Sequence, residues 1–244
     1  MIITMQSFRG GVGKSSLTKN LALEIALQGK HISLVDLDIS APSLHLCFNS
    51  DPRENTFTIN DFLLERCELS HVLKNPRKGL DFYPASLELD KLCSLLENGY
   101  NIARLTKAIQ ELDKKSDVVL IDNHSSITEE AMGVLLVSHK ILLVTTPDLS
   151  SLEGIFLWRA ILERLGINEE KILIILNKVF AARQDIQKIQ AQLLQGAKKT
   201  ADFIFFFSEE IALDGNNGQT PIHLKYPKSV FSQTIRDLAN KILN

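Results

Sequence analysis

The hydrophobic positions of this chain follow two alternating patterns. Short, continuously apolar runs are typical of strands covered on both faces, and they predict strands over residues 2–7, 31–36, 80–84, 117–122, 140–145, 171–177 and 203–207. Between them, apolar residues recur every three or four positions, which predicts helices over 16–28, 102–115, 154–165 and 185–195. A similar repeat from Val230 to Ile242 predicts a last helix that packs on the domain.

This alternation predicts the fold class: α/β, a single doubly wound, mainly parallel sheet with helices on both faces. The sequence shows no internal repeat, low-complexity stretch or Pro/Gly-rich linker over its 244 residues. We therefore expect one domain spanning residues 1–244.

A glycine-rich segment follows the first predicted strand and opens the first predicted helix. It reads Gly10, Gly11, Val12, Gly13, Lys14, Ser15, Ser16. Backbone N–H groups of such a turn, together with the helix N-terminus, attract a polyphosphate. Lys14 is expected to reach the β- and γ-phosphates, and Ser15 to ligate Mg²⁺. An ordinary strand-to-helix turn is the alternative, but the Lys-Ser pair favours phosphate binding. The general phosphate-loop motif has a glycine where this chain has Phe8.

Without that first glycine, the loop resembles the deviant Walker A motif of the MinD/ParA family of P-loop ATPases. Further segments resemble motifs of this family in the same order. They are 35–38 (a second acidic motif), 118–122 (the Walker B strand), 144–148, 175–178 (the end of the base-binding strand) and the tail 219–229. The tail resembles the MinD-like branch. On these motifs the chain is identified as a member of the family.

The resemblance implies a slow ATPase that uses Mg²⁺, and it assigns roles to several residues. Lys14, Asp38 and Arg9 are the implied catalytic group, in which Asp38 orients the attacking water. Arg9 stands where the family has its signature lysine, which is thought to reach the partner's phosphates across a dimer interface. Ser15, Asp36 and Asp122 are the implied metal site. Nucleotide binding is assigned to residues Gly10 to Ser16 and to Asn177.

The sequence leaves alternatives at three of these positions. Two acids at i and i+2 at a strand end point the same way, so Asp36 and Asp38 can both face the phosphates; Asp36 could instead form loop hydrogen bonds. Arg9 could be an exposed loop residue. Asn177 offers adenine both a donor and an acceptor, but it could also be a buried turn-former. Guanine recognition by an N-K-x-D motif needs Asp where Phe180 stands, so ATP is expected over GTP.

Two segments depart from the family pattern. Residues 123–126 replace a short Pro/Gly-containing switch after Asp122, and residues 205–208 replace a proline near the adenine. We interpret His124, within the first segment, as a packing or hydrogen-bonding substitute rather than a chemical group. These departures keep open an alternative function, a slow or inactive nucleotide-binding scaffold.

Composition narrows the class of protein further. The net charge of −2 gives no overall positive field toward nucleic acid or anionic lipid, so nucleic-acid binding stays open and membrane attachment is not expected.

Cys47, Cys67 and Cys93 form no C-x-x-C pair. This argues against a zinc site, a disulfide framework and the Fe–S carrier-type relatives, which segment 38–43 otherwise resembles. The N-terminus does not resemble a signal peptide. We expect a cytoplasmic, ATP-dependent homodimer with an unidentified protein partner.

Overall fold

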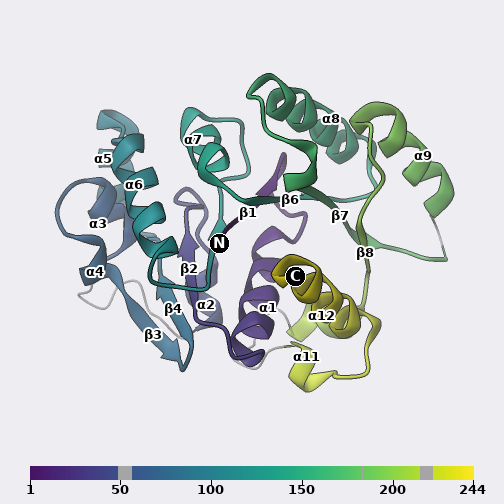
Figure 1. Ribbon diagram of the computed structural model, residues 1–244, viewed down its shortest axis with the longest axis horizontal. Helices are drawn as coiled ribbons and strands as arrows, with labels where there is room; N and C mark the ends of the chain where they lie inside the picture. The colour runs from purple at the N-terminus through teal and green to yellow at the C-terminus, as the bar shows by residue number, and fades with distance from the viewer. Residues whose placement is uncertain (49–56, 183, 215–221) are drawn as a thin grey trace.

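The computed structural model describes residues 1–48, 57–182, 184–214 and 222–244. A single eight-stranded sheet runs through these residues in the order β3-β4-β2-β5-β1-β6-β7-β8 (Figure 1). The strands are β1 (Ile2–Ser7), β2 (Ile32–Asp36), β3 (Lys74–Arg77), β4 (Leu80–Tyr83), β5 (Val118–Asp122), β6 (Lys140–Thr145), β7 (Ile172–Val179) and β8 (Phe203–Phe206). The pairs are parallel except for the antiparallel hairpin β3–β4 at one edge.

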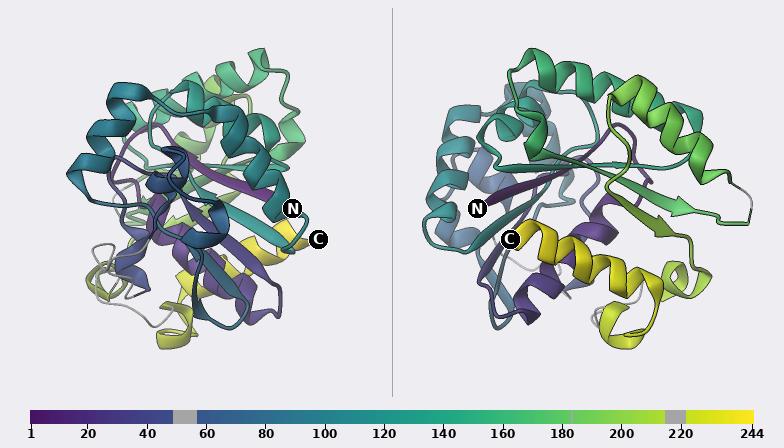
Figure 2. Two further views of the ribbon diagram at one scale, coloured as in Figure 1. Left: turned by 90° about the vertical axis from the view of Figure 1, so that its left-hand side faces the viewer. Right: turned by 45° about the vertical axis from the view of Figure 1, so that its right-hand side comes forward.

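Helices cover both faces of the sheet (Figure 2). They are α1 (Lys14–Leu27), α2 (Leu44–Cys47), α3 (Ile59–Leu63), α4 (Leu69–Val72), α5 (Leu89–Asn98), α6 (Ile102–Asp113), α7 (Glu129–Val137), α8 (Leu149–Arg164), α9 (Ile186–Ala197), α10 (Glu209–Asp214), α11 (Ile222–Lys225) and α12 (Val230–Leu243), with a 3₁₀ turn at Glu169–Lys171. α1 and α12 bury their apolar sides in one core. α6 to α9 pack on the opposite face in two further clusters. The expected fold class is confirmed.

The site is positioned by the central strands. β1 lies between β5 and β6, and β5 pairs with β2 so that Asp36 lies opposite Asp122. Parallel strands end at the same edge of a sheet, and ligands of such sheets bind outside these carboxyl ends. The phosphate loop and both acidic motifs therefore meet at one edge.

Each expected strand is present, with boundary differences of one or two residues. The sequence did not predict β3, the helices between 44 and 98, α7, α10 or α11. β3 is polar and contains Pro76, which is tolerated at a sheet edge but carries no strand signal. The helix expected at 154 begins at Leu149, because the side chain of Asp148 accepts a hydrogen bond from the backbone of Ser151 and caps it.

Three further expectations concern particular segments. Cys67 and Cys93 are free thiols. The first part of the tail motif, residues 219–221, lies outside the described residues. Among the helices that the structure describes, none combines the length and apolar character needed to cross a bilayer.

Candidate nucleotide site

Phe8 explains how this loop does without the first glycine of the general motif. A Cβ added at Gly154 would lie 2.3 Å from the Cβ of Phe8, so the Phe8 side chain packs closely on α8. One residue earlier, the carbonyl of Ser7 accepts a hydrogen bond from Trp158 Nε1 at 3.3 Å. Phe8 thus belongs to the core beside α8, and the phosphate loop begins after it.

The loop itself depends on two glycines with positive φ. Gly11 has φ 79° and Gly13 has φ 90°, a region that side chains disfavour. Gly13 is also constrained by space, since a Cβ there would lie 2.4 Å from Asn177 Nδ2. Helix α1 then begins directly at Lys14. Glycine at position 13 therefore lets the start of the helix approach the end of β7.

The end of β7 holds the loop from outside. Asn177 Nδ2 donates to the carbonyl of Val12 at 2.8 Å, and Lys178 Nζ donates to the carbonyl of Gly11 at 2.7 Å. These bonds occupy two carbonyl oxygens that would otherwise repel an anion. Asn177 is where the base-binding residue was expected, but its donor is engaged by the loop. Lys178 was missed as a functional residue, although the adjacent Asn-Lys pair was visible in the sequence.

Lys14 lies in a buried cluster of carboxylates. Its Nζ is 2.7 Å from Asp122 Oδ1 and 3.2 Å from Asp38 Oδ2, and 4% of its side chain is exposed. Burial lowers the pKa of Lys14, but the nearby charges of Asp122 and Asp38 outweigh it and raise the pKa above its ordinary value. Thr18, one turn further along α1, donates to Asp122 Oδ1 at 3.2 Å. Sequence reasoning missed Thr18, whose signal is its i+4 spacing from Lys14.

Two oxygens of this cluster suit a cation. Asp36 is fully buried, and its Oδ1 accepts a hydrogen bond from the backbone of Asp38 at 3.1 Å. Asp36 Oδ2 and Asp122 Oδ2 are buried without a hydrogen-bond partner. Buried carboxylate oxygens left without donors suit a hard cation such as Mg²⁺. Ser15, the second residue of α1, is partly buried.

Within the described ranges, no three His, Cys, Asp or Glu side chains form a metal cage. Mg²⁺ bound with a nucleotide needs few protein ligands, because phosphates and water supply the others. The residues present therefore fit a nucleotide-bound Mg²⁺.

Burial and the charge of Asp122 raise the pKa of Asp36 well above its ordinary value. An acid whose pKa rises on folding stabilises the protein at low pH and loses that contribution as pH rises. Asp36→Asn is therefore expected to stabilise the nucleotide-free protein at pH 7 by about 1–2 kcal/mol, which raises Tm by about 2–8 °C. The advantage should shrink as pH falls toward about 4.

Thermal unfolding across this pH range, without nucleotide, measures the difference. Asp237→Asn, on the exposed side of α12, is the matched control and should change Tm little. A variant less stable than the wild type at pH 7 would contradict the prediction.

Arg9 lies apart from the Lys14 cluster. Its Nη1 is 3.4 Å from Asp148 Oδ1, and about half of each side chain is exposed, 52% and 50%. Burial raises the pKa of Asp148, but hydrogen bonds from Thr146 and Ser151 and the charge of Arg9 lower it overall. The structure thus brings Lys14, Asp36, Asp38 and Asp122 together but leaves the Arg9 guanidinium at the rim.

The segment after β5 is joined to its neighbours by hydrogen bonds. His124 Nε2 lies 3.2 Å from Ser40 Oγ, and His124 Nδ1 accepts from the backbone of Ser126 at 3.1 Å. Gln6 donates to the carbonyl of His124 at 2.8 Å and accepts from Asn123 at 2.8 Å. His124 therefore links the loops after β2 and β5, which agrees with a hydrogen-bonding role. Gln6 and Asn123 were missed as parts of this link.

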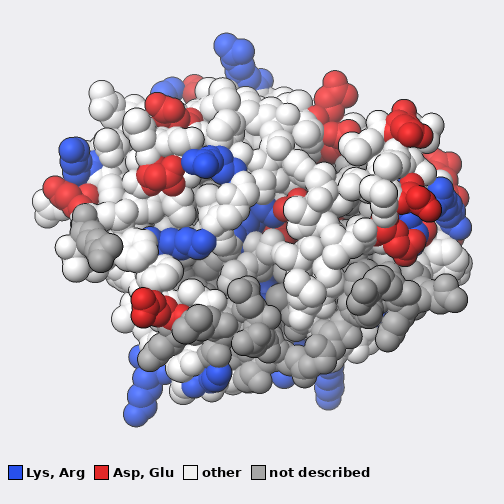
Figure 3. Space-filling model, turned by 180° about the vertical axis from the view of Figure 1, so that it is seen from behind, with Lys and Arg blue, Asp and Glu red and all other residues white. Residues whose placement is uncertain are grey.

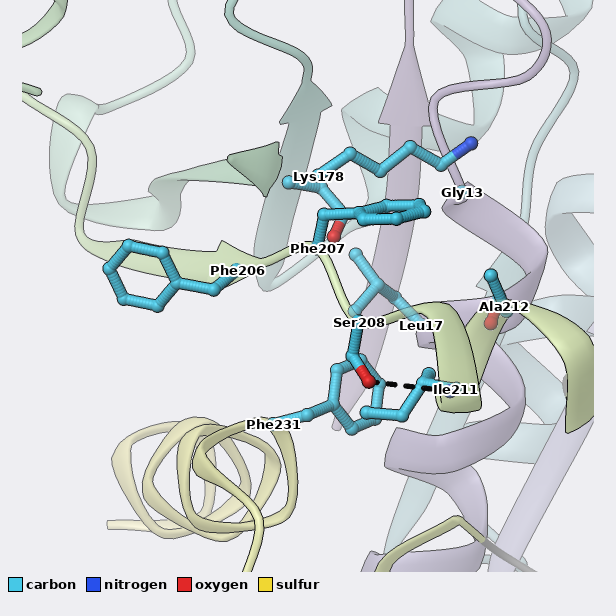
Figure 4. Close-up of a pocket in the computed structure, with 11 residues that line it drawn as sticks. Gly13, Leu17, Lys178, Phe206, Phe207, Ser208, Ile211, Ala212 and Phe231 are labelled. Carbon is cyan, nitrogen blue, oxygen red and sulfur yellow. Dashed lines mark hydrogen bonds between the residues drawn. The ribbon is translucent and has the colours of Figure 1, made fainter. Parts of the chain in front are cut away.

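A cavity of about 300 Å³ opens beside the phosphate loop (Figure 4). It is lined by Gly13, Ser16, Leu17, Asn177, Lys178, Phe206, Phe207, Ser208, Ile211, Ala212 and Phe231.

On the face seen in Figure 3, basic and acidic side chains of the described residues are interspersed rather than gathered into a field of one sign. The charges of the described residues on this face therefore form no field of one sign that would attract an anion to it.

Comparison with known proteins agrees with this arrangement. A family model described as an AAA domain matches residues 1–175. The septum site-determining protein MinD of Helicobacter pylori is 32% identical over 154 residues, a match that covers 62% of this chain and 55% of the relative. The matched segment thus spans about half the length of that relative.

Two solved structures have the same fold over almost the whole chain. MinD of Pyrococcus horikoshii OT3, complexed with Mg-ADP, has a TM-score of 0.80 at 22% identity and covers 99% of this chain and 95% of its own. A ParA family ATPase of Chlorobium tepidum TLS has a TM-score of 0.82 at 20% identity, with 98% of each chain covered. With the matched family model and the motifs gathered at one edge of the sheet, the chain belongs to the MinD/ParA family of deviant Walker A P-loop ATPases.

Proposed function

We propose that the protein binds and hydrolyses Mg-ATP slowly and acts as a nucleotide-switched homodimer that positions or regulates a protein partner in the cytoplasm. The whole of residues 1–244 forms the ATPase domain in this proposal. The observation that carries it is the buried ammonium of Lys14, between Asp122 and Asp38 at the start of α1. A lysine with only a structural role would not require an adjacent glycine-rich loop that is hydrogen-bonded to the end of β7.

Nucleotide binding would change the partners of Lys14. A γ-phosphate above the loop attracts the Lys14 ammonium, which leaves Asp38 and Asp122 without their present cation. Asp122, with Ser15 and Asp36, would then hold Mg²⁺, which neutralises charge on the phosphates. Asp38 would accept a hydrogen bond from the water that attacks the γ-phosphorus as the bond to the ADP oxygen breaks. ATP binding would therefore release Asp38 from Lys14, so that Asp38 could orient the attacking water.

The Mg-ADP complex of the P. horikoshii relative supports the choice of ligand. A MinC:MinD complex is known from Aquifex aeolicus, whose structure has a TM-score of 0.82 with this chain. These relatives support a nucleotide and a protein partner for this chain. Slow turnover is proposed because segment 123–126 replaces the Pro/Gly-containing switch of the family.

Asp38→Ala is expected to keep ATP binding and to slow hydrolysis by about 100-fold or more, because the water loses its acceptor. Asp38 also competes with phosphate for Lys14, so ATP affinity should stay equal or rise. Calorimetry gives the affinity and phosphate release gives the rate. Asp38→Asn, of the same shape, should lose activity similarly. Hydrolysis at the wild-type rate in both variants would refute the role of Asp38.

A further inference from the structure

We propose that the ring of Phe207 is the platform on which the nucleobase stacks. This inference rests on the proposed function, since it concerns the base of the same nucleotide. The segment after β8 would then determine base affinity, together with Asn177.

The cavity beside the phosphate loop has the right place for a base. Gly13 and Ser16 line one side of it, so it begins where the loop and α1 hold phosphate. Leu17, Ile211 and Phe231 give it apolar walls. Its volume of about 300 Å³ lies at the lower end of the range for small-ligand pockets, about 300–1,000 Å³. A flat, partly apolar group attached to phosphates fits this shape.

Phe207 presents an aromatic ring to that cavity (Figure 4). The ring lies 4.5 Å from the ring of Phe180, centroid to centroid, at an interplanar angle of 27°. Phe180 does not line the cavity, so it supports Phe207 from elsewhere and leaves ring surface open toward the cavity. About a third of Phe207, 36%, is exposed. A buried role in the core does not account for a ring placed in this way.

The backbone fixes this ring. The backbone N–H of Phe207 donates to the carbonyl of Val179 at 2.9 Å, which joins the end of β8 to the end of β7. The backbone N–H of Phe180, the next residue, donates to Gln184 at 2.8 Å. The first bond ties the Phe207 segment to β7, and the second fixes Phe180 within the loop that follows β7, so the platform exists before a ligand arrives.

Asn177 complements the platform with an acceptor. Its Nδ2 donates to the carbonyl of Val12, which fixes the orientation of the amide. The hydrogen bond that Asn177 makes among the described residues uses Nδ2 and leaves Oδ1 available as an acceptor. A base that offers an amino group suits this oxygen. Adenine carries the N6 amino group where guanine carries the O6 acceptor, so the site favours adenine.

The test compares ligands with and without a base. Calorimetry with Mg²⁺ measures binding of ADP, GDP and inorganic pyrophosphate to the wild type, Phe207→Leu and Phe207→Trp. Base–aromatic stacking predicts that Phe207→Leu weakens ADP binding by about 10-fold and leaves pyrophosphate binding unchanged. Phe207→Trp should retain ADP binding. Phe203→Leu is the matched control, because Phe203 is a partly buried phenylalanine of β8 that does not line the cavity.

Every other outcome would contradict the stacking platform, the proposed function or the role of Asn177. Unchanged ADP affinity in Phe207→Leu would overturn the platform while leaving the proposed function intact. An equal loss of ADP and pyrophosphate binding would overturn it too, because Phe207 would then act through the phosphate loop. If the folded wild type bound neither ADP nor ATP, the proposed function would itself fail, and the platform with it. GDP binding as tight as ADP binding would contradict the role given to Asn177.

Discussion

Lys14→Ala is expected to weaken ATP binding by at least about 100-fold. In the proposed site the Lys14 side chain supplies the cation that binds the phosphates, and hydrogen bonds between ionised partners are the strong ones. The position of Lys14 makes substitution difficult to compensate, since the ammonium is buried and fixed between Asp122 and Asp38. Calorimetry on the folded variant, with a non-hydrolysable ATP analogue, gives the affinity. Affinity equal to that of the wild type would remove the basis for the site assignment.

The same substitution has a second effect that must be separated from the first. Removing Lys14 leaves Asp36, Asp38 and Asp122 near one another without their cation. Breaking a buried ion pair by removing one partner typically costs about 3–5 kcal/mol. Lys14→Ala should therefore unfold at a lower temperature than the wild type, even without nucleotide.

A double variant separates folding from binding. Asp122→Asn in the Lys14→Ala background removes one of the uncompensated charges, so much of the lost stability should return. ATP binding should stay as weak as in Lys14→Ala, because the cation is still missing. Thermal unfolding and calorimetry on the same samples measure both quantities. If the double variant regained both stability and ATP binding, Lys14 would be a folding residue and not a phosphate ligand.

How much of this site is visible in the sequence depends on whether the signal is local. The loop from Gly10 to Ser16 could be predicted, because its chemistry lies in consecutive residues that follow an apolar strand. Asp36 and Asp122 could be placed near it, because each ends a predicted strand. That Asp36 and Asp122 are direct neighbours, with Lys14 Nζ bonded to Asp122 and Asp38, appears only when β2 and β5 pair.

Contacts between distant segments gave no such signal. Phe8 packs on Gly154, and Lys178 binds the carbonyl of Gly11, across more than 140 residues in each case. Neither pairing has a periodicity or spacing in the sequence. The stacked rings of Phe180 and Phe207 likewise depend on the register of β7 with β8. The fold could therefore be predicted from repeated local patterns, but the supports of the loop and the cavity beside it could not.

The exposed position of Arg9 is relevant to dimer formation. Its contact with Asp148 joins two side chains that are about half exposed. Exposed ion pairs contribute about 0–1 kcal/mol, so the guanidinium can leave Asp148 at little cost. Arg9 thus lies at the rim of the loop, outside the buried cluster of its own subunit, as the proposed contact with the nucleotide of a second copy requires.

Arg9→Ala is therefore expected to leave ATP binding by the monomer nearly intact and to weaken ATP-dependent dimerisation. Hydrolysis should fall by about 1,000-fold, because the developing charge on the transferred phosphoryl group loses a cation, as when an arginine finger is removed. Arg9→Lys should keep much of both activities, and any loss measures the contribution of the planar guanidinium. Sedimentation with a non-hydrolysable ATP analogue gives the dimerisation constants, and phosphate release gives the rates.

Asp148→Asn is the matched control for Arg9. It removes the charge that Arg9 contacts within its own subunit, while asparagine can still cap α8 at this position. If Arg9 acts across the interface, Asp148→Asn should dimerise as well as the wild type or better, since the guanidinium is released. If Arg9 instead acts through its contact with Asp148, Arg9→Ala and Asp148→Asn should have the same dimerisation constants. Equal dimerisation constants for the wild type and Arg9→Ala would defeat the cross-interface role, and with it the main argument for a nucleotide-switched dimer.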